Sequence, residues 1–359
     1  MKKAAGAFVV ELSIPRAIFG ADAVMRVQDE LARLGITRVL LIASASQADT
    51  GARLKHALGS ICVALFTDVK MHVPRELVDT AYERLVANAA DGLACVGGGS
   101  AVGLAKALAL RKALPIVAVP TTYAGSEATP IYGITEAGVK KTGRNPVVLP
   151  KTVIYDPALT FGLTSHITVT SGLNALAHAF EALYAENTNP VIAALSVEAM
   201  RVLVRALPAA KANPHDRDAR QECQYGAYLC GVALGNAAMS LHHKACHVLG
   251  GSFNLPHAEV HSVMLPYALA YNAPFAPQLA RLSAIFPGED IAVAVKAFAK
   301  KLTAPMSLRE IGMHESDLNG ATHLMCETPY PNPRTLDPKD IRSMLQDAYT
   351  GARPRSEFQ

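Results

Sequence analysis

Four histidines and one asparagine are spaced so that their side chains could meet at one point. Asn174 and His178 lie four residues apart, and residues four apart on a helix share a face. His243 and His247 form a second pair of the same kind. His257, which follows in the sequence, is expected to reach the same point from a loop. Two helices and a loop arranged in this way favour a catalytic cluster over histidines that only fill a core.

Asn174 bears on the chemistry that this cluster could perform. A divalent cation gains most from an anionic ligand, and a neutral amide in place of a carboxylate removes one full charge from the ion's surroundings. Three histidines can still hold zinc without a carboxylate. The residues therefore favour metal-free catalysis, with a metal-dependent enzyme as the alternative. Two further histidines, His242 and His261, are interpreted as bystanders, because a single histidine on an apolar face is more often a core residue.

A glycine-rich turn upstream is typical of a phosphate-binding site. Gly97, Gly98, Gly99 and Ser100 follow a strand-like run and precede a helix-like one. Glycines at such a turn let the backbone approach an anion, and the first amides of the helix attract it. The spacing is not the common dinucleotide fingerprint, so this turn alone is a weak signal.

A second polar loop follows the next strand-like run and includes Thr121, Thr122 and Ser126. Ligands of open α/β sheets bind at the carboxyl ends of the strands, so two such loops predict a nucleotide site. An early strand ends at Ser44 rather than at an acidic residue, and Asp49 comes late for that role. Because a carboxylate there usually selects NADH over NADPH, we expect little discrimination between these two cofactors.

Alternating strand-like and helix-like runs predict an N-terminal α/β domain, residues 1–158, with a parallel Rossmann-like sheet. The expected strands are five apolar runs rich in branched residues: 38–43, 61–66, 92–96, 115–119 and 153–156. Helix-like spacing in this part covers residues 22–34, 47–58, 75–89 and 101–110. From residue 159 to 359, Ala/Leu-rich segments predict an all-α domain. Its expected helices are residues 168–185, 190–206, 219–235, 237–250, 291–302 and 338–351.

Composition narrows the class of protein. The chain has 359 residues, of which 50% are hydrophobic and 18% charged, as in a compact globular protein. Its net charge of +4 is mild, and no basic stripe suggests a nucleic-acid partner. No apolar run approaches the roughly 18 residues that span a bilayer, and six cysteines without a CxxC pair suit reduced thiols. We therefore expect a cytoplasmic protein that binds neither nucleic acid nor membrane.

Five segments of the chain resemble the iron-containing (group III) alcohol dehydrogenase family, in the family's order. They are residues 97–100, 120–127, 149–157, 172–178 and 243–257, and the likeness extends over roughly residues 10 to 350. The resemblance implies an α/β nucleotide-binding domain and a helical domain with the active site between them, an architecture shared with dehydroquinate synthase. It also implies an oxidoreductase that uses NADH or NADPH, and it implies a homodimer.

Three features make the chain most similar to family members that reduce 2-maleylacetate to 3-oxoadipate during the degradation of aromatic compounds. Metal-dependent members have aspartate where this chain has Asn174, and their threonine–glycine loop lacks Tyr123. The tail, residues 330–334, is also similar. This resemblance implies that no metal is required. The alternative is a metal-dependent (iron or zinc) alcohol or polyol dehydrogenase of the same family.

The expected substrate is a small dianion, so its pocket should offer cations or hydrogen-bond donors. The candidate substrate-binding residues are Lys140, Arg144, Arg334 and Tyr123. Hydride from the nicotinamide would add to the conjugated alkene, and the resulting enolate needs a hydrogen-bond donor rather than a metal. We assign that donor to His243, helped by His178 or His257. His247 is the candidate proton donor that completes the reduction.

Two other classes of protein remain as alternatives. A ring-forming lyase similar to dehydroquinate synthase shares the architecture, but the basic residues that it needs around a phosphate are not evident in this sequence. A nucleotide-binding protein without catalysis would have no use for four histidines in this spacing.

Overall fold

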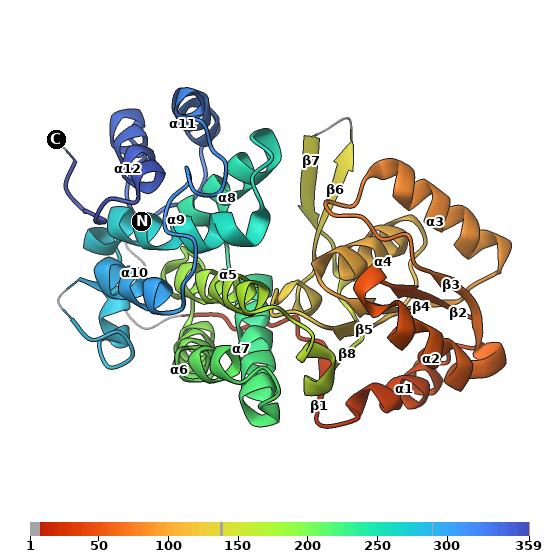
Figure 1. Ribbon diagram of the computed structural model, residues 1–359. Helices are drawn as coiled ribbons and strands as arrows, with labels where there is room; N and C mark the ends of the chain where they lie inside the picture. The colour runs from red at the N-terminus through yellow and green to blue at the C-terminus, as the bar shows by residue number, and fades with distance from the viewer. Residues whose placement is uncertain (1–7, 137–138, 289, 359) are drawn as a thin grey trace.

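A parallel sheet with helices on both faces adjoins a bundle of helices (Figure 1). The computed structural model describes residues 8–136, 139–288 and 290–358, with residues 139 and 140 described by their backbone only. The strands of the sheet are β1 Arg16–Phe19, β2 Val39–Ala43, β3 Cys62–Phe66, β4 Gly92–Gly97, β5 Ile116–Pro120 and β8 Thr152–Tyr155. They lie parallel in the order β1-β8-β5-β4-β2-β3. The five predicted strands are confirmed to within one residue at each end.

Helices cover both faces of this sheet, as the continuous apolar strands require. One face packs on α1 Val27–Arg33 and α2 Ala48–Leu58 through one apolar cluster. The other packs on α3 Arg75–Ala87 and α4 Gly99–Arg111 through a second. All five residues of β2 are buried, with alternate side chains in the two clusters. The predicted α/β part of the fold is therefore confirmed.

The rest of the described chain after β8 is helical. Its α-helices are α5 Ser165–Tyr184, α6 Pro190–Ala212, α7 Arg217–Asn236, α8 Leu241–Ser252, α9 His257–Asn272, α10 Ile291–Lys301, α11 Leu318–Cys326 and α12 Pro338–Thr350. The six predicted helices are confirmed, and α9 and α11 were missed. Pro266 lies inside α9, and proline ordinarily disfavours a helix interior. His257 is thus the first residue of a helix, and its expected place on a loop was wrong.

Three strands of the structure lack the apolar pattern that predicts a strand. β1 is a short edge strand with a half-exposed surface. β6 Ile131–Glu136 and β7 Val139–Arg144 form a separate antiparallel hairpin. The sequence of β7 is mostly polar, so tertiary contacts rather than alternation set its structure. No helix among the described residues is both long and apolar enough to cross a bilayer.

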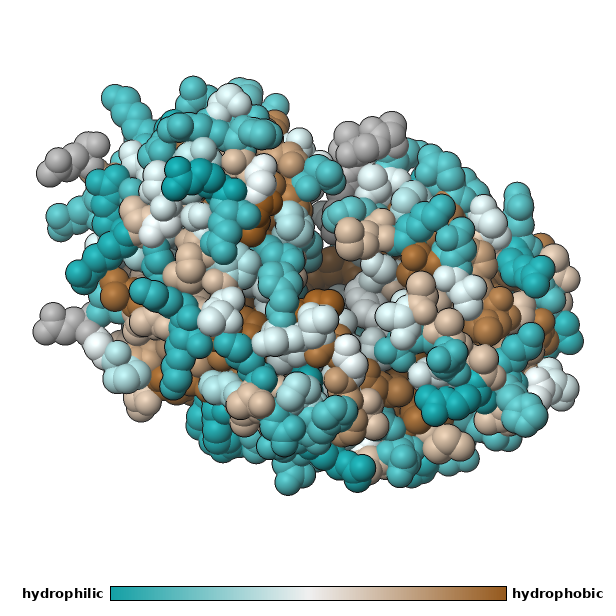
Figure 2. Space-filling view, viewed as in Figure 1, coloured by the Kyte–Doolittle hydropathy of each residue, from teal (hydrophilic) through white to brown (hydrophobic). Residues whose placement is uncertain are grey.

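The sheet and the bundle meet where α7 packs against the loop that follows β5. A Cβ atom on Gly231 of α7 would collide with the backbone oxygen of Gly125 in that loop, and one on Gly235 would lie 3.1 Å from the oxygen of Ala128. Gly125 itself has φ +76°, a conformation that favours glycine. These glycines let the backbone of α7 contact the backbone of the loop after β5 directly. The surface between the two halves is hollowed (Figure 2).

We predict that Gly231→Ala lowers the melting temperature, because the added methyl group overpacks this contact at a cost of about 1–3 kcal/mol. Gly251→Ala in α8 is the matched control, since a Cβ there meets nothing within 4 Å. Both changes improve helix propensity by about 0.8–1 kcal/mol, so only the collision distinguishes them. Thermal unfolding of the three proteins measures the difference. Equal melting temperatures for the two variants would contradict the close approach.

Candidate active site

The glycine-rich turn lies between β4 and α4, as the sequence predicts. Gly97 has φ +150°, and a Cβ there would lie 2.8 Å from the hydroxyl of Ser44. Gly98 precedes α4 in an extended conformation, and no side chain caps the helix. The first amides of α4 therefore have no partner within the helix and can hold an anion such as a phosphate. Gly99 and Ser100 are the first two residues of α4, and Gly99 is exposed.

The other predicted cofactor residues converge on this turn. Ser44 follows β2, and its amide donates to Val96 in β4. The amide of Thr121, after β5, donates to the carbonyl of Gly97, and the side chain of Thr122 lies 3.0 Å from the Cβ position of Gly98. The strand order reverses between β2 and β4, which is where open α/β sheets bind nucleotides. The structure thus brings these residues together at a site that suits a dinucleotide.

A buried lysine that sequence reasoning missed supports the loop after β5. The side chain of Lys106, on α4, donates hydrogen bonds of 2.7 Å to the carbonyls of Ser126, Thr129 and Ile131. Burial lowers the pKa of Lys106 to about 7. The hydroxyl of Ser126 is buried without a partner among the described residues, so it remains available to a ligand.

The histidine cluster is built on one face of α5. Asn174, His178 and Glu181 are spaced by four and three residues and point the same way. Nδ1 of His178 lies 2.8 Å from Nε2 of His243 on α8, and Nε2 of His178 lies 3.1 Å from the carbonyl of Ala124. The two predicted histidines are therefore in direct contact. Oδ1 of Asn174 is buried without a partner in the described structure.

Glu181 is a residue of the site that sequence reasoning missed. Its carboxylate accepts hydrogen bonds from the amides of Ser240, His242 and His243 at the start of α8. It also lies 2.7 Å from Nδ1 of His243 and is fully buried. A carboxylate at the amino end of a helix is favoured by the free amides and the helix dipole. The spacing of Asn174, His178 and Glu181 on one helical face is the signal that could have revealed it.

A proton count assigns the charge of this network. The carboxylate of Glu181 and the carbonyl of Ala124 can only accept, so the chain Glu181–His243–His178–Ala124 needs three ring protons. Two neutral imidazoles carry two. Burial, and then the neighbouring charge of His243, lower the pKa of His178 well below its ordinary value. The fully bonded network therefore carries three ring protons and no net charge, because the third proton offsets the carboxylate of Glu181.

The remaining predicted histidines lie around this pair at different depths. His247 is exposed, and its ring centroid lies 6.3 Å from that of His243. His257 is partly buried, and its ring lies 4.5 Å from that of His261. The ring of His261 also lies 5.2 Å from that of His243. The structure thus places the ring of His261 next to the cluster and His242 beside it, both fully buried. Their interpretation as bystanders of the chemistry stays a prediction.

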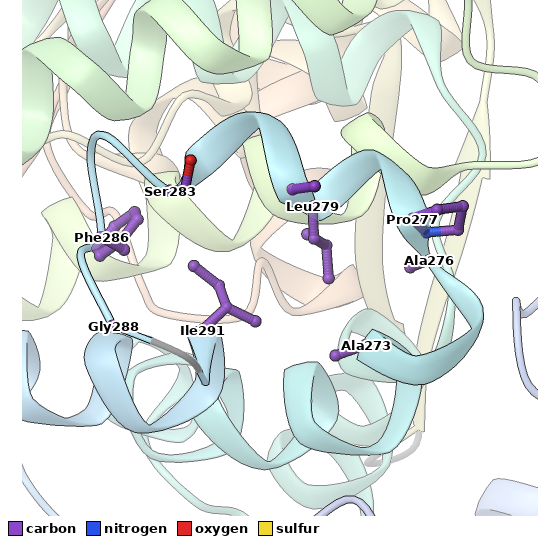
Figure 3. A pocket seen from close by; sticks show the side chains of 9 residues that line it. Ala273, Ala276, Pro277, Leu279, Ser283, Phe286, Gly288 and Ile291 are labelled. Carbon is purple, nitrogen blue, oxygen red and sulfur yellow. The ribbon is translucent and has the colours of Figure 1, made fainter.

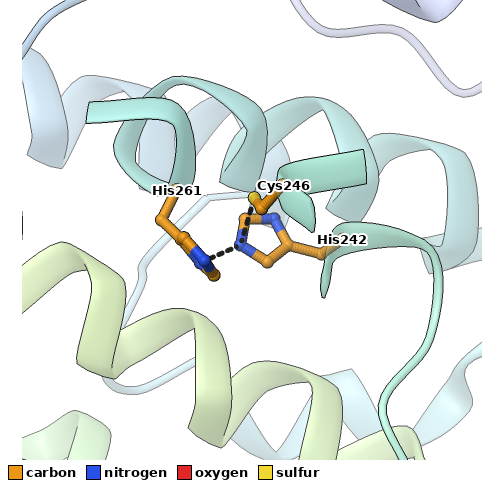
Figure 4. A group of neighbouring side chains, drawn as sticks. All are labelled: His242, Cys246 and His261. Carbon is orange, nitrogen blue, oxygen red and sulfur yellow. Dashed lines mark hydrogen bonds between the residues drawn. The ribbon is translucent and has the colours of Figure 1, made fainter. Parts of the chain in front are cut away.

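The predicted site fits a divalent metal poorly. One group among the described residues has ligand atoms close enough together to hold an ion: His242, Cys246 and His261 (Figure 4). None of these three belongs to the predicted histidine cluster. Both ring nitrogens of His178 already face polar atoms of the protein. Asn174 adds no charge that would compensate an ion. We derive no chemical step through a metal.

Three predicted substrate-binding residues make contacts within the protein. Arg144 donates to the carbonyl of Gly235 at the end of α7. Arg334 pairs with Asp340 at 2.6 Å. Tyr123 is fully buried, with its hydroxyl 3.1 Å from Arg220. None of these contacts favours a role in substrate binding, and the side chain of Lys140 lies outside the described part of the structure.

A cavity of about 290 Å³ lies away from the histidines, at α10 and the turns before it (Figure 3). Its lining includes Leu279, Phe286 and Ile291 and has no charged side chain. An apolar cavity of this kind does not suit an anionic substrate.

We predict that stability falls steeply as the pH is lowered below about 6.5. Burial first, and neighbouring imidazole charge second, lower the pKa values of His178, His242 and His261 well below their ordinary value. Above pH 6.5 both the folded and the unfolded chain keep these rings neutral, so the stability is fully present. Below pH 6.5 the unfolded chain takes up protons before the folded chain does. Each such histidine then lowers the free energy of unfolding by about 1.4 kcal/mol per pH unit. Urea unfolding between pH 7.5 and 5.5 measures this slope, and a flat profile would contradict the neutral, buried rings.

Comparison with known proteins agrees with this geometry. Residues 15–157 match the iron-containing alcohol dehydrogenase family, and residues 168–349 match its C-terminal part. Maleylacetate reductase from Pseudomonas sp. (strain P51) is 47% identical over 97% of this chain and 99% of its own. Crystal structures of maleylacetate reductases from Rhizobium sp. strain MTP-10005 and Agrobacterium tumefaciens are each 45% identical with a TM-score of 0.93, over 97% of this chain and 100% and 99% of theirs. The family expected from the sequence motifs is confirmed: this chain belongs to the iron-containing alcohol dehydrogenase family.

Proposed function

We propose that this chain reduces maleylacetate to 3-oxoadipate with NADH or NADPH. Its family is that of the iron-containing alcohol dehydrogenases, and three relatives that are 47% identical over 99% of their own length are maleylacetate reductases. The structural observation that carries the proposal is the buried Glu181–His243–His178 network. We assign the third ring proton to the His178–His243 pair, so a positive charge balanced by Glu181 lies next to the nucleotide-binding edge of the sheet, because Ala124, the last member of the network, belongs to the loop after β5.

The chemistry of maleylacetate suits this network. Its alkene is conjugated with a ketone, so reduction of the alkene moves negative charge onto the ketone oxygen. When bound, NAD(P)H supplies the hydride. The positive charge on the His178–His243 pair stabilises the enolate oxygen, and Glu181 keeps His243 oriented for this. The carbon next to the ketone then takes a proton, for which exposed His247 is the candidate donor.

We also propose that this reaction needs no metal. A simple alcohol needs a Lewis acid to become an alkoxide, whereas an enolate is stabilised by a hydrogen-bond donor or an imidazolium. Asn174 brings no negative charge that would favour a metal ion. A metal ion bound by His178 and His243 would also need the two ring nitrogens that face each other in their hydrogen bond. The homodimer, the cytoplasmic location, the roles of the individual site residues and the preference between NADH and NADPH stay predictions.

We predict that the purified protein oxidises NADH or NADPH when maleylacetate is added, and that exhaustive chelation leaves the rate unchanged. The decrease of nicotinamide absorbance measures the rate, and elemental analysis of the same sample measures residual iron and zinc. Loss of activity on chelation that Fe²⁺ or Zn²⁺ restores would instead favour a metal-dependent dehydrogenase. An absence of any turnover of maleylacetate in either sample would contradict the proposed substrate.

We predict that His243→Ala lowers kcat by about 100-fold or more, because it removes the imidazolium that faces the developing charge. Glu181→Gln keeps the shape of the side chain but removes the negative charge that holds the extra proton, and it should lower kcat by about tenfold or more. Steady-state kinetics measure kcat, and nicotinamide fluorescence measures cofactor binding, which should not change. His215→Ala, an exposed histidine elsewhere, is the control. Wild-type kcat in His243→Ala would remove the network from the mechanism.

A further inference from the structure

His242 and His261 form a second pair of histidines, next to the His178–His243 pair. Nε2 of His242 lies 2.9 Å from Nδ1 of His261, and the thiol of Cys246 lies 3.5 Å from the same nitrogen of His242 (Figure 4). His242 and Cys246 belong to α8, whereas His261 belongs to α9. All three side chains are fully buried. The reaction described above uses none of them.

The ring of His261 touches the rings of three histidines of the cluster. Its centroid lies 4.5 Å from that of His257, 5.2 Å from that of His243 and 5.9 Å from that of His178. All three contacts are edge-to-face, with interplanar angles between 70° and 79°. A ring that packs against three others in this way limits how far each can rotate.

The histidine pair is unfavourable for folding. The contact between the two rings needs one donor and one acceptor, so each neutral ring has a single further nitrogen to satisfy. Nε2 of His261 is buried without a partner among the described residues, whereas His242 also interacts with the backbone of Met264. In either arrangement of the protons Nε2 of His261 stays unsatisfied, as a donor or as an acceptor, which costs free energy of folding. Apolar side chains of similar size would avoid this cost.

We propose that His261, held by its hydrogen bond to His242, is a positioning residue that fixes the orientation of His243, His178 and His257. The inference rests on the proposed function, because it concerns the histidines that stabilise the enolate. A polar pair that weakens the fold while packing against three site rings is expected where orientation matters more than stability. The thiol of Cys246 lies against the same nitrogen of His242 that faces His261.

A bound ion is the other explanation for this group, and the geometry favours the hydrogen bond. Two nitrogens on one tetrahedral zinc ion would lie about 3.4 Å apart, as follows from zinc–nitrogen distances of about 2.0–2.1 Å. The separation of 2.9 Å is that of an ordinary N–H···N contact. The described residues offer only these three converging ligands, one fewer than a closed structural zinc site.

The test is a double-mutant cycle with His242→Leu, His261→Leu and the combined variant. Each single change leaves the partner's nitrogen unpaired and should lower the melting temperature, whereas the combined variant should melt at or above the wild-type temperature. In the combined variant kcat should fall by about 10- to 100-fold, because the site rings lose their support. The affinity for NADH should not change. A merely structural pair would give the opposite result: a lower melting temperature and an unchanged kcat.

A more conservative variant guards against loss of the fold. His261→Gln keeps a polar partner for His242 but removes the ring, so it should fold and still show a reduced kcat. Wild-type kcat in folded His261→Gln, or in the folded combined variant, would overturn the proposal. So would one equivalent of zinc in the purified wild-type protein that Cys246→Ala abolishes.

A wrong substrate and the absence of a positioning role for His261 give different experimental results. If wild-type protein does not reduce maleylacetate, the proposed function fails, but the orientation of the rings can still be read without a substrate. The ¹⁵N NMR signals of the His178 and His243 rings should shift in His261→Gln, because their shared proton is no longer held in place. Unchanged signals would contradict the positioning role.

Discussion

One buried carboxylate holds the site together. Glu181 accepts three backbone amides at the start of α8 and also orients the ring of His243. Helix starts usually satisfy their free amides with a side chain of their own N-cap residue, but Ser240 makes no such bond. A group from α5 replaces it, so the position of α8 and the charge of the active-site imidazole depend on the same side chain. The start of α8 and the orientation of the His243 ring are therefore coupled at this residue.

The network closes across the two halves of the molecule. Its last acceptor, the carbonyl of Ala124, belongs to a loop of the sheet half, whereas both histidines belong to the helical half. The position of that loop is set by backbone contact between Gly125 and Gly231 and by the bonds of buried Lys106. Because the same loop follows β5 at the nucleotide-binding edge, the imidazole pair and the expected nicotinamide are brought together by one short segment.

The sequence predicted those parts of the fold and site that have a local signal. The apolar strands, the glycine-rich turn and the pair Asn174/His178 are read from neighbouring residues and were found as expected. Glu181 was missed because a single acid in an Ala-rich helix resembles an ordinary surface charge. The position of His261 next to the cluster was missed because α9, which carries it there, contains a proline. The partners of Arg144 and Arg334 within the protein, a carbonyl and a carboxylate, could not be predicted because only tertiary packing supplies them.

We propose that an imidazolium held by the carboxylate of Glu181 takes the place of a metal ion in this site. The protonation state of His243 tests it most directly. In ¹⁵N NMR spectra of metal-free protein at neutral pH, both ring nitrogens of His243 should be protonated, and one should lose its proton in Glu181→Gln. A neutral His243 ring in the metal-free wild-type protein, together with turnover that depends on added metal, would contradict the account.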